Sequence, residues 1–358
     1  MHAAVDDLGR SETFHGYGPP TGYPFLREVI ARCEFQDHGI DVNAEEIFVS
    51  DGSKGDCASI LDILGSENRI AITDPVYPVY VDTNVMVGHT GVAGDNGQYA
   101  GLTYLPATAE NNFVPDIPST PLDLIYLCYP NNPTGETITR SQLEAWVEYA
   151  RANDAIILYD VAYKDFIRDD TLPKSIYEIP GARNCAIEFH SFSKSGGFTG
   201  VRCGFTVCPR ELTAKTTDGT RLVLHDLWSR RWSTKSNGVS YVVQRGAESL
   251  YSDDGKAQSK AIIDKYLQHG ALLRKGCESL GLTVYGAQHS PYVWAACPDG
   301  VSSWEMFDQM LQDHQIIVMP GSGFGSCGEG YIRISAFPSA EVVAEVVERM
   351  SKISSHSA

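Results

Sequence analysis

Residues 185–204 read CAIEFHSFSKSGGFTGVRCG, and this segment gives the strongest indication of both the fold and the chemistry of the chain. The apolar run from Cys185 to His190 predicts a buried strand. Lys194 follows at the exit of this strand between small hydroxyl side chains, and Arg202 comes eight residues later. A lysine amine in this position can form a Schiff base, and hydroxyls together with an arginine can hold a phosphate.

These groups suit a cofactor that combines a carbonyl group with a phosphate, and pyridoxal 5′-phosphate (PLP) is such a cofactor. Taken alone, a lysine after a strand is as often a solvated surface residue. Other polar residues follow or interrupt predicted strands: Asn132 after 124–127, Asp160 and Tyr163 after 155–159, and Arg333 within 330–335. Because sites on parallel sheets form at the carboxyl ends of the strands, the Asn, Asp and Lys segments are expected to share one pocket.

The order of these segments resembles that of the fold-type I PLP-dependent aminotransferases, which are class I/II aminotransferases. Among them the LL-diaminopimelate aminotransferases are the most similar, since their lysine segment resembles Ser193-Lys194-x-x-Gly197-Phe198-Thr199-Gly200-Val201-Arg202. The resemblance extends from about residue 16 to about residue 349. It implies PLP as the cofactor, amino acids and 2-oxo acids as small-molecule partners, and a homodimer with shared active sites.

The composition is that of a soluble globular protein, with 43% hydrophobic and 20% charged residues in 358. A formal charge of −17 argues against nucleic acid and anionic membrane surfaces as partners, because both would repel the protein. No apolar stretch approaches the roughly 18 residues needed to cross a bilayer.

The nine cysteines show neither a CxxC pair nor zinc-ligand spacing, and no metal site is expected. Several of them fall in or beside apolar runs, so reduced core cysteines and a cytoplasmic location are expected. The resembled family carries several dozen residues before the Gly16-Tyr17-Gly18 turn, and these are not found here. A plastid location therefore stays open, because the N-terminus looks incomplete.

The pattern predicts an α/β fold. Between residues 46 and 207 short apolar strands alternate with amphipathic helices, and continuous apolar strands indicate a mainly parallel sheet buried between helices. A capping box at Ser141 and Glu144 predicts a helix with an inward stripe of Leu143, Trp146, Val147 and Ala150. Long helices are expected over 222–250 and 257–280, followed by a smaller α+β part. The predicted domains are a helical N-terminal segment (1–15), a large PLP-binding domain (16–255) and a small C-terminal domain (256–358).

Ser53 and Lys54 follow a predicted strand at 46–50 and begin an apolar helix. Backbone amides at a helix start attract phosphate, although an ordinary N-cap turn explains this segment equally well. The resemblance makes Ser53 a phosphate ligand and places Lys54 near cofactor and substrate. After the lysine strand, Ser191, Ser193 and Arg202 are similarly placed to hold the phosphate.

Asp160 is the carboxylate expected to pair with the pyridine nitrogen of the cofactor, with a turn or N-cap aspartate as the simpler alternative. Asn132 and Tyr163 would hydrogen-bond the phenolic oxygen of the ring, although Asn132 also suits a β-turn before Pro133. Tyr77 is suited to stack on the ring face, and the alternative is a plain loop aromatic.

Arg333 is a charged residue in an apolar strand and needs an anionic partner. A substrate α-carboxylate would satisfy it, and so would an internal salt bridge. The run from Gly321 to Gly325 is not a dinucleotide fingerprint and predicts a turn before the arginine strand. In the resembled family, the residues matching Tyr17 and Asn237 reach into the site of the neighbouring subunit.

The resemblance thus implies three groups of site residues. The catalytic residues are Lys194, Asp160 and Tyr163. The cofactor contacts are Tyr17, Ser53, Lys54, Tyr77, Asn132, Asp160, Tyr163, Ser191, Ser193, Lys194 and Arg202. The substrate contacts are Lys54, Tyr77, Asn132, Asn237 and Arg333.

The expected reaction is ping-pong amino transfer with Lys194 as the Schiff-base lysine. The resemblance implies glutamate with 2-oxoglutarate as one pair, and LL-2,6-diaminopimelate with tetrahydrodipicolinate, in lysine biosynthesis, as the other. Three alternatives stay open: an aspartate or aromatic aminotransferase, a PLP-dependent lyase, and an inactive cofactor-binding protein. Ser236 and Pro338 stand where the family leads us to expect an aromatic residue and a glycine, which bears on the choice of substrate.

Overall fold

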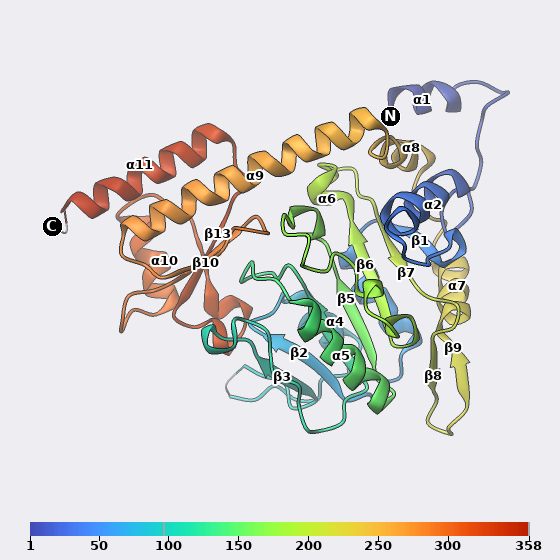
Figure 1. Ribbon diagram of the computed structural model, residues 1–358, viewed down its shortest axis with the longest axis horizontal. Coiled ribbons are helices and arrows are strands. Elements are labelled where there is room, and N and C mark those ends of the chain that lie inside the picture. The colour runs from blue at the N-terminus through green and yellow to red at the C-terminus, as the bar shows by residue number, and fades with distance from the viewer. Residues whose placement is uncertain (96, 357–358) are drawn as a thin grey trace.

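The computed structural model describes residues 1–95 and 97–356 (Figure 1). A seven-stranded sheet forms the centre of the larger part, in the order β1-β7-β6-β5-β4-β2-β3. Strands β2 to β6 run parallel to their neighbours in this order, and β7 is antiparallel to both β6 and β1. The bounds are β1 Ile47–Ser50, β2 Ile70–Asp74, β3 Leu102–Pro106, β4 Leu124–Cys128, β5 Ile156–Asp160, β6 Ala186–Ser191 and β7 Gly204–Val207. The expected mainly parallel α/β sheet is confirmed.

The central strands are buried on both faces, which explains their continuous apolar sequences. Successive side chains of β5 point into different cores: Ile157 and Tyr159 belong to one cluster, and Ile156 and Leu158 to the other. Polar groups are costly within such strands unless they are paired. The ends of the strands are therefore the natural place for reactive side chains.

Helices cover this sheet and the region beyond it. Their bounds are α1 His2–Leu8, α2 Pro24–Ile30, α3 Ser53–Ser59, α4 Val79–Met86, α5 Arg140–Asn153, α6 Phe192–Ser195, α7 Leu224–Lys235, α8 Tyr241–Ser249, α9 Asp253–Ser279, α10 Ser303–Gln312 and α11 Ala340–His356. No helix in the described part of the chain is long and apolar enough to cross a membrane.

The inward stripe of α5 is confirmed, since all four predicted side chains are buried. The predicted capping box at Ser141 and Glu144 is wrong. Thr139 is the N-cap, because its backbone is extended and its hydroxyl accepts a hydrogen bond from the Gln142 amide. The Thr139 amide in turn donates to Gln142 Oε1, which completes a capping box two residues earlier than predicted.

The expected continuous helix over 222–250 is also wrong. A hairpin of β8 (Thr213–Lys215) and β9 (Arg221–Val223) precedes α7, and the chain breaks between α7 and α8. Gly238 lies in this break with a φ of 78°, a conformation that favours glycine. Ser240 then caps α8 by accepting a hydrogen bond from the Val243 amide. Apolar periodicity alone did not reveal this interruption.

A second, antiparallel sheet has the order β10-β11-β13-β12, with β10 Val284–Gly286, β11 Tyr292–Ala296, β12 Met319–Pro320 and β13 Tyr331–Ser335. Figure 1 shows this sheet beside the large one, with the long helix α9 spanning both and α11 running alongside α9. The predicted domain boundary after residue 255 falls in the first turn of α9 and stays a prediction.

All nine cysteines are free, and six of them are buried. Cys128, Cys185, Cys203 and Cys208 are among the buried ones, as their positions in or beside apolar strands indicated. They act as small apolar core residues.

Asp56 gives the fold a testable pH dependence. It is 1% exposed on α3, and its carboxylate accepts a hydrogen bond of 2.6 Å from the Ser50 hydroxyl. Burial raises the pKa of Asp56 to about 7, from 3.8 for an exposed aspartate. The folded protein then binds this proton more tightly than the unfolded chain, so this carboxyl costs stability as the pH rises from about 4 to about 7.

We therefore expect Asp56→Asn to stabilise the protein relative to wild type at pH 8 more than at pH 4.5. The difference is on the order of 2–4 kcal/mol in the free energy of unfolding, measured with urea. Asp123→Asn is the matched control. Hydrogen bonds from Arg69 lower the pKa of Asp123, so its substitution is expected to lower the free energy of unfolding more at pH 8 than at pH 4.5. A gain for Asp56→Asn that does not change with pH would contradict this assignment.

Candidate active site

A cavity of about 220 Å³ lies at the carboxyl ends of β4, β5 and β6. Ten of the predicted site residues line it: Ser53, Lys54, Tyr77, Asn132, Asp160, Tyr163, Ser191, Ser193, Lys194 and Arg202. They come from segments up to about 150 residues apart in sequence, which the parallel strands bring to one edge of the sheet.

Asp160 is the last residue of β5 and is 4% exposed. Its Oδ2 accepts a hydrogen bond of 2.8 Å from the Tyr80 hydroxyl, and its Oδ1 accepts one of 3.1 Å from the Ala162 amide. Burial raises the pKa of Asp160 to about 6. Among the described residues no Lys, Arg or His forms a salt bridge with it. The nearby charge of Lys194 lowers the pKa of Asp160 without a direct salt bridge, and a cationic ring nitrogen placed beside this carboxylate would supply a direct ion-pair partner.

Lys194 lies in α6, directly after β6, and is partly buried. Burial lowers its pKa, and the charges of Arg202 and Arg333 lower it further. Its amine lies 5.1 Å from the centre of the Phe337 ring and has no ion-pair partner in the described part of the chain. A lysine with a lowered pKa carries more of the unprotonated amine, which is the nucleophilic form.

The hydroxyl and guanidinium groups beside Lys194 form a set of anion-binding donors. Arg202 Nη1 donates to the Ser193 hydroxyl at 3.1 Å, and the Ser193 amide donates to the Ser191 hydroxyl at 3.2 Å. Arg202 holds a φ of 63°, which is uncommon for a residue with a side chain. A Cβ on Gly52 would lie 3.0 Å from Arg202 Nη2, so a glycine keeps this approach open. These donors fit a phosphate group.

Asn132 and Tyr163 connect the cavity to the smaller sheet. Tyr163 shares a hydrogen bond of 2.7 Å with the Tyr292 hydroxyl of β11, and Asn132 Oδ1 accepts one of 2.6 Å from Arg333 of β13. Both residues are nearly fully buried. The position of Tyr163 at the wall of the cavity is compatible with a contact to a bound ring.

Arg333 has no carboxylate partner in the part of the chain that the structure describes. Its Nε is buried without a hydrogen bond, and its guanidinium carbon lies 4.5 Å from the Tyr292 ring centre and 4.7 Å from that of Phe324. The internal salt bridge that the sequence left open is therefore not found among the described residues. A guanidinium without a carboxylate partner in the protein is suited to bind the carboxylate of a ligand.

Tyr17 and Asn237 do not line the cavity. Tyr17 is 92% exposed, and Asn237 is exposed in the break between α7 and α8. Their predicted contribution to the site of a neighbouring subunit stays a prediction.

Several residues at the site were missed by sequence reasoning. Tyr80 and Cys128 line the cavity, and Tyr292 and Phe337 contact its predicted residues. For Tyr80 a signal existed, because it lies three residues after Tyr77, in the first turn of the helix that follows the β2 strand. Tyr292 and Phe337 gave no such signal, since their roles arise from contacts between distant segments.

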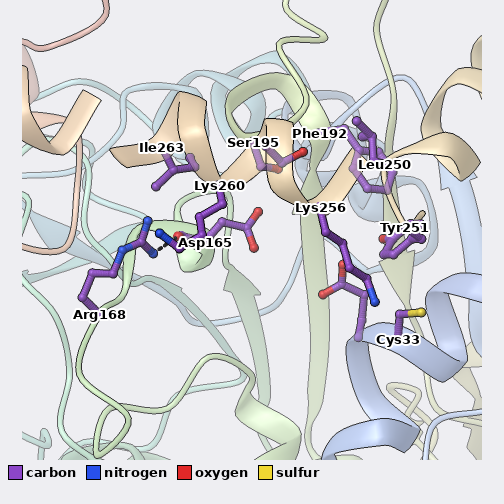
Figure 2. A pocket seen from close by; sticks show the side chains of 12 residues that line it. Cys33, Asp165, Arg168, Phe192, Ser195, Leu250, Tyr251, Lys256, Lys260 and Ile263 are labelled. Atoms are coloured by element: carbon purple, nitrogen blue, oxygen red, sulfur yellow. Dashed lines mark hydrogen bonds between the residues drawn. The ribbon is translucent and has the colours of Figure 1, made fainter. Parts of the chain in front are cut away.

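A second cavity of about 250 Å³ lies on another side of α6, between α6 and α9 (Figure 2). Figure 2 shows Lys256, Lys260 and Ile263 on α9, with Phe192 and Ser195 of α6 beside this helix. None of the predicted site residues lines this second cavity. The cavity around Asp160 and Lys194 is therefore the candidate active site.

The chain belongs to the family described as aminotransferase class I and II, which it matches over residues 1–350. Enzymes of this family use PLP and act on amino acids and 2-oxo acids, and the donors and acceptors of the cavity fit that cofactor.

Solved structures give more specific similarities. L,L-Diaminopimelate aminotransferase from Chlamydomonas reinhardtii is 42% identical, with a TM-score of 0.92, over 99% of this chain and 85% of that one. BacF from Bacillus subtilis is 26% identical, with a TM-score of 0.83, over 99% and 86%. An aromatic aminotransferase from Pyrococcus horikoshii is 24% identical, with a TM-score of 0.84 over 99% and 91%, and shares the fold.

Tyr80 allows a test of the Asp160 environment. Tyr80→Phe removes the hydroxyl that donates to Asp160 and leaves a less stabilised carboxylate. We expect the dissociation constant of PLP to rise roughly tenfold, and more at pH 6.5 than at pH 8.5, because the pKa of Asp160 rises further. Absorbance titration of the cofactor-free protein measures this constant.

Tyr126→Phe is the matched control. Tyr126 is buried and stacks on Tyr80 with ring centres 5.1 Å apart, but its hydroxyl accepts from Asn84 instead. Equal PLP affinities for the two variants would show that the Tyr80 hydroxyl does not support Asp160.

Proposed function

We propose that this aminotransferase moves amino groups between glutamate with 2-oxoglutarate and LL-2,6-diaminopimelate with tetrahydrodipicolinate, in a ping-pong reaction of lysine biosynthesis. The observation that carries the reaction type is one cavity that holds both Lys194 and the buried Asp160, with Arg333 bonded to its wall through Asn132. The 42% identity with an L,L-diaminopimelate aminotransferase over 99% of the chain supports the substrate pair.

Bound PLP supplies an electron sink that acidifies the substrate Cα–H bond. The amine of Lys194, with its lowered pKa, takes the proton from Cα and returns it as general base and acid. The carboxylate of Asp160 holds a positive charge on the ring nitrogen, which strengthens the sink. Arg202 with Ser53, Ser191 and Ser193 fixes the phosphate end.

Arg333 binds the α-carboxylate of the substrate with its guanidinium, whose Nε–H has no hydrogen-bond partner in the described part of the chain. Because Asn132 accepts from one side of its guanidinium, the remaining donors face a limited range of directions. A carboxylate held in this way orients the Cα–H bond relative to the lysine amine. Lys54 and Tyr77 at the wall of the cavity are assigned to the substrate as well.

The full site is proposed to need a homodimer, with Tyr17 and Asn237 contributing to the site of the partner. The high exposure of Tyr17 in the single chain supports this assignment. The proposed location is the cytoplasm, with the plastid as the alternative.

Substrate profiling tests the proposal. The protein is loaded with PLP, and its visible absorbance is followed after separate additions of LL-diaminopimelate, glutamate, aspartate and tyrosine. We expect the cofactor absorbance to respond to diaminopimelate and glutamate at concentrations at least about tenfold lower than to the other two, because one chemical difference in a specific pocket gives about this discrimination.

Lys194→Ala is the inactive reference. It is expected to bind PLP noncovalently and to lose turnover by about 10⁴-fold, while Lys256→Ala, an exposed lysine of the second cavity, keeps wild-type turnover. A preference for aspartate or tyrosine would move the assignment to that aminotransferase. Release of ammonia or pyruvate without an oxo acid would indicate a lyase instead.

A further inference from the structure

The loop of residues 321–328 is tied to the end of β2, far away in sequence. Asp74 is the last residue of β2 and is 1% exposed. Its Oδ2 accepts a hydrogen bond of 2.6 Å from the Ser326 hydroxyl, and its Oδ1 accepts one of 3.0 Å from the Cys327 amide. Gln98 adds a third, longer bond at 3.3 Å. Asp74 does not line the active-site cavity.

Two further features hold this loop in place. The Val76 amide donates a hydrogen bond of 2.7 Å to the carbonyl of Phe324. Gly325 adopts a φ of 131°, and a Cβ at this position would collide with Asp74 Oδ1. The loop can therefore reach the carboxylate only with a glycine here. Gly325 and Ser326 are thus the loop residues that make the contact with Asp74 possible.

The loop carries Phe324, which contacts Arg333. The Phe324 ring is 5% exposed, its centre lies 4.7 Å from the guanidinium carbon, and it packs against Trp294. Trp294 is the residue opposite Arg333 in the pairing of β11 and β13. A shift of the loop would therefore change the surroundings of the guanidinium directly.

We propose that Asp74 is a positioning residue for carboxylate recognition: it holds the 321–328 loop so that Phe324 fixes the guanidinium of Arg333 in its binding orientation. This proposal rests on the proposed role of Arg333. In this arrangement Asp74 touches neither substrate nor cofactor. Its loss weakens carboxylate binding while the lysine chemistry and the phosphate contacts stay intact.

Asp74→Asn tests this with nearly unchanged shape. One carboxylate oxygen becomes an NH2 group that donates and does not accept, so the side chain can no longer accept the bonds of both Ser326 and Cys327. Asp123→Asn is the matched control. Asp123 is partly exposed and is bonded to Arg69 next to the opposite end of β2, so the substitution removes a hydrogen-bonded carboxylate that does not hold the 321–328 loop. Ser326→Ala is a milder second variant that removes one donor only and keeps Asp74.

Three quantities are measured on the PLP-loaded protein. The first is the dissociation constant of propionate, an unreactive carboxylate, by calorimetry. The second is the split between KM for glutamate and kcat. The third is the rate of alkylation of Cys327, which lies on the loop, followed by mass spectrometry. Arg333→Gln identifies the part of propionate binding that depends on Arg333.

In Asp74→Asn we expect the propionate constant and KM to rise roughly tenfold, while kcat and PLP content stay within about twofold of wild type. Cys327 is expected to react faster. Ser326→Ala should raise the propionate constant, KM and the rate of Cys327 alkylation by about threefold. Asp123→Asn should leave all three unchanged.

A propionate constant no higher in Asp74→Asn than in Asp123→Asn would overturn the proposal, and so would a parallel loss of PLP content or kcat. Failure of the proposed function can be distinguished from failure of the positioning role. If the wild type transfers no amino groups but binds propionate in a way that needs both Arg333 and Asp74, the amino-transfer assignment fails and the positioning role stands.

Discussion

The parallel alignment of β4, β5 and β6 is the constraint on which the rest of the site depends. These strands are buried on both faces, so their interiors accommodate few polar side chains, and their carboxyl ends meet at one edge. Asp160 and Lys194 lie at two of these ends. Their proximity follows from strand pairing alone, before any contact between their side chains is considered.

The second constraint is electrostatic. Asp160 is a buried carboxylate without a salt-bridge partner in the described part of the chain, although the nearby charge of Lys194 acts on it, and Arg333 is a guanidinium without a carboxylate partner there. Each is held by neutral hydrogen bonds or aromatic rings instead of an opposite charge. Leaving such groups unpaired costs stability, and a bound cofactor and substrate would recover this cost. The cavity is thus shaped for ligands that bring both a positive and a negative charge.

Sequence patterns predicted the central strands because continuous apolar runs are typical of strands buried on both faces. They also predicted Asn132, Asp160 and Lys194 at one pocket, since each lies within a few residues of the end of such a run. The Thr139 cap and the break at Gly238 were missed, because local hydrogen bonds and a left-handed turn determine them rather than apolar periodicity.

Contacts between residues far apart in the chain could not be predicted from the sequence. The bond between Tyr163 and Tyr292 spans 129 residues, and that between Arg333 and Asn132 spans 201. The contact of Asp74 with a loop of the smaller part of the molecule spans about 250 residues, and no local pattern indicated it.

The proposed chemistry depends above all on Lys194 as the residue that bonds PLP covalently. The most direct measurement is reduction of the PLP-loaded protein with borohydride, followed by proteolysis and mass spectrometry of the labelled peptide. We expect the pyridoxyl label on Lys194 alone, and no label after Lys194→Ala. A label on Lys54, or an unlabelled protein that still binds PLP, would contradict it.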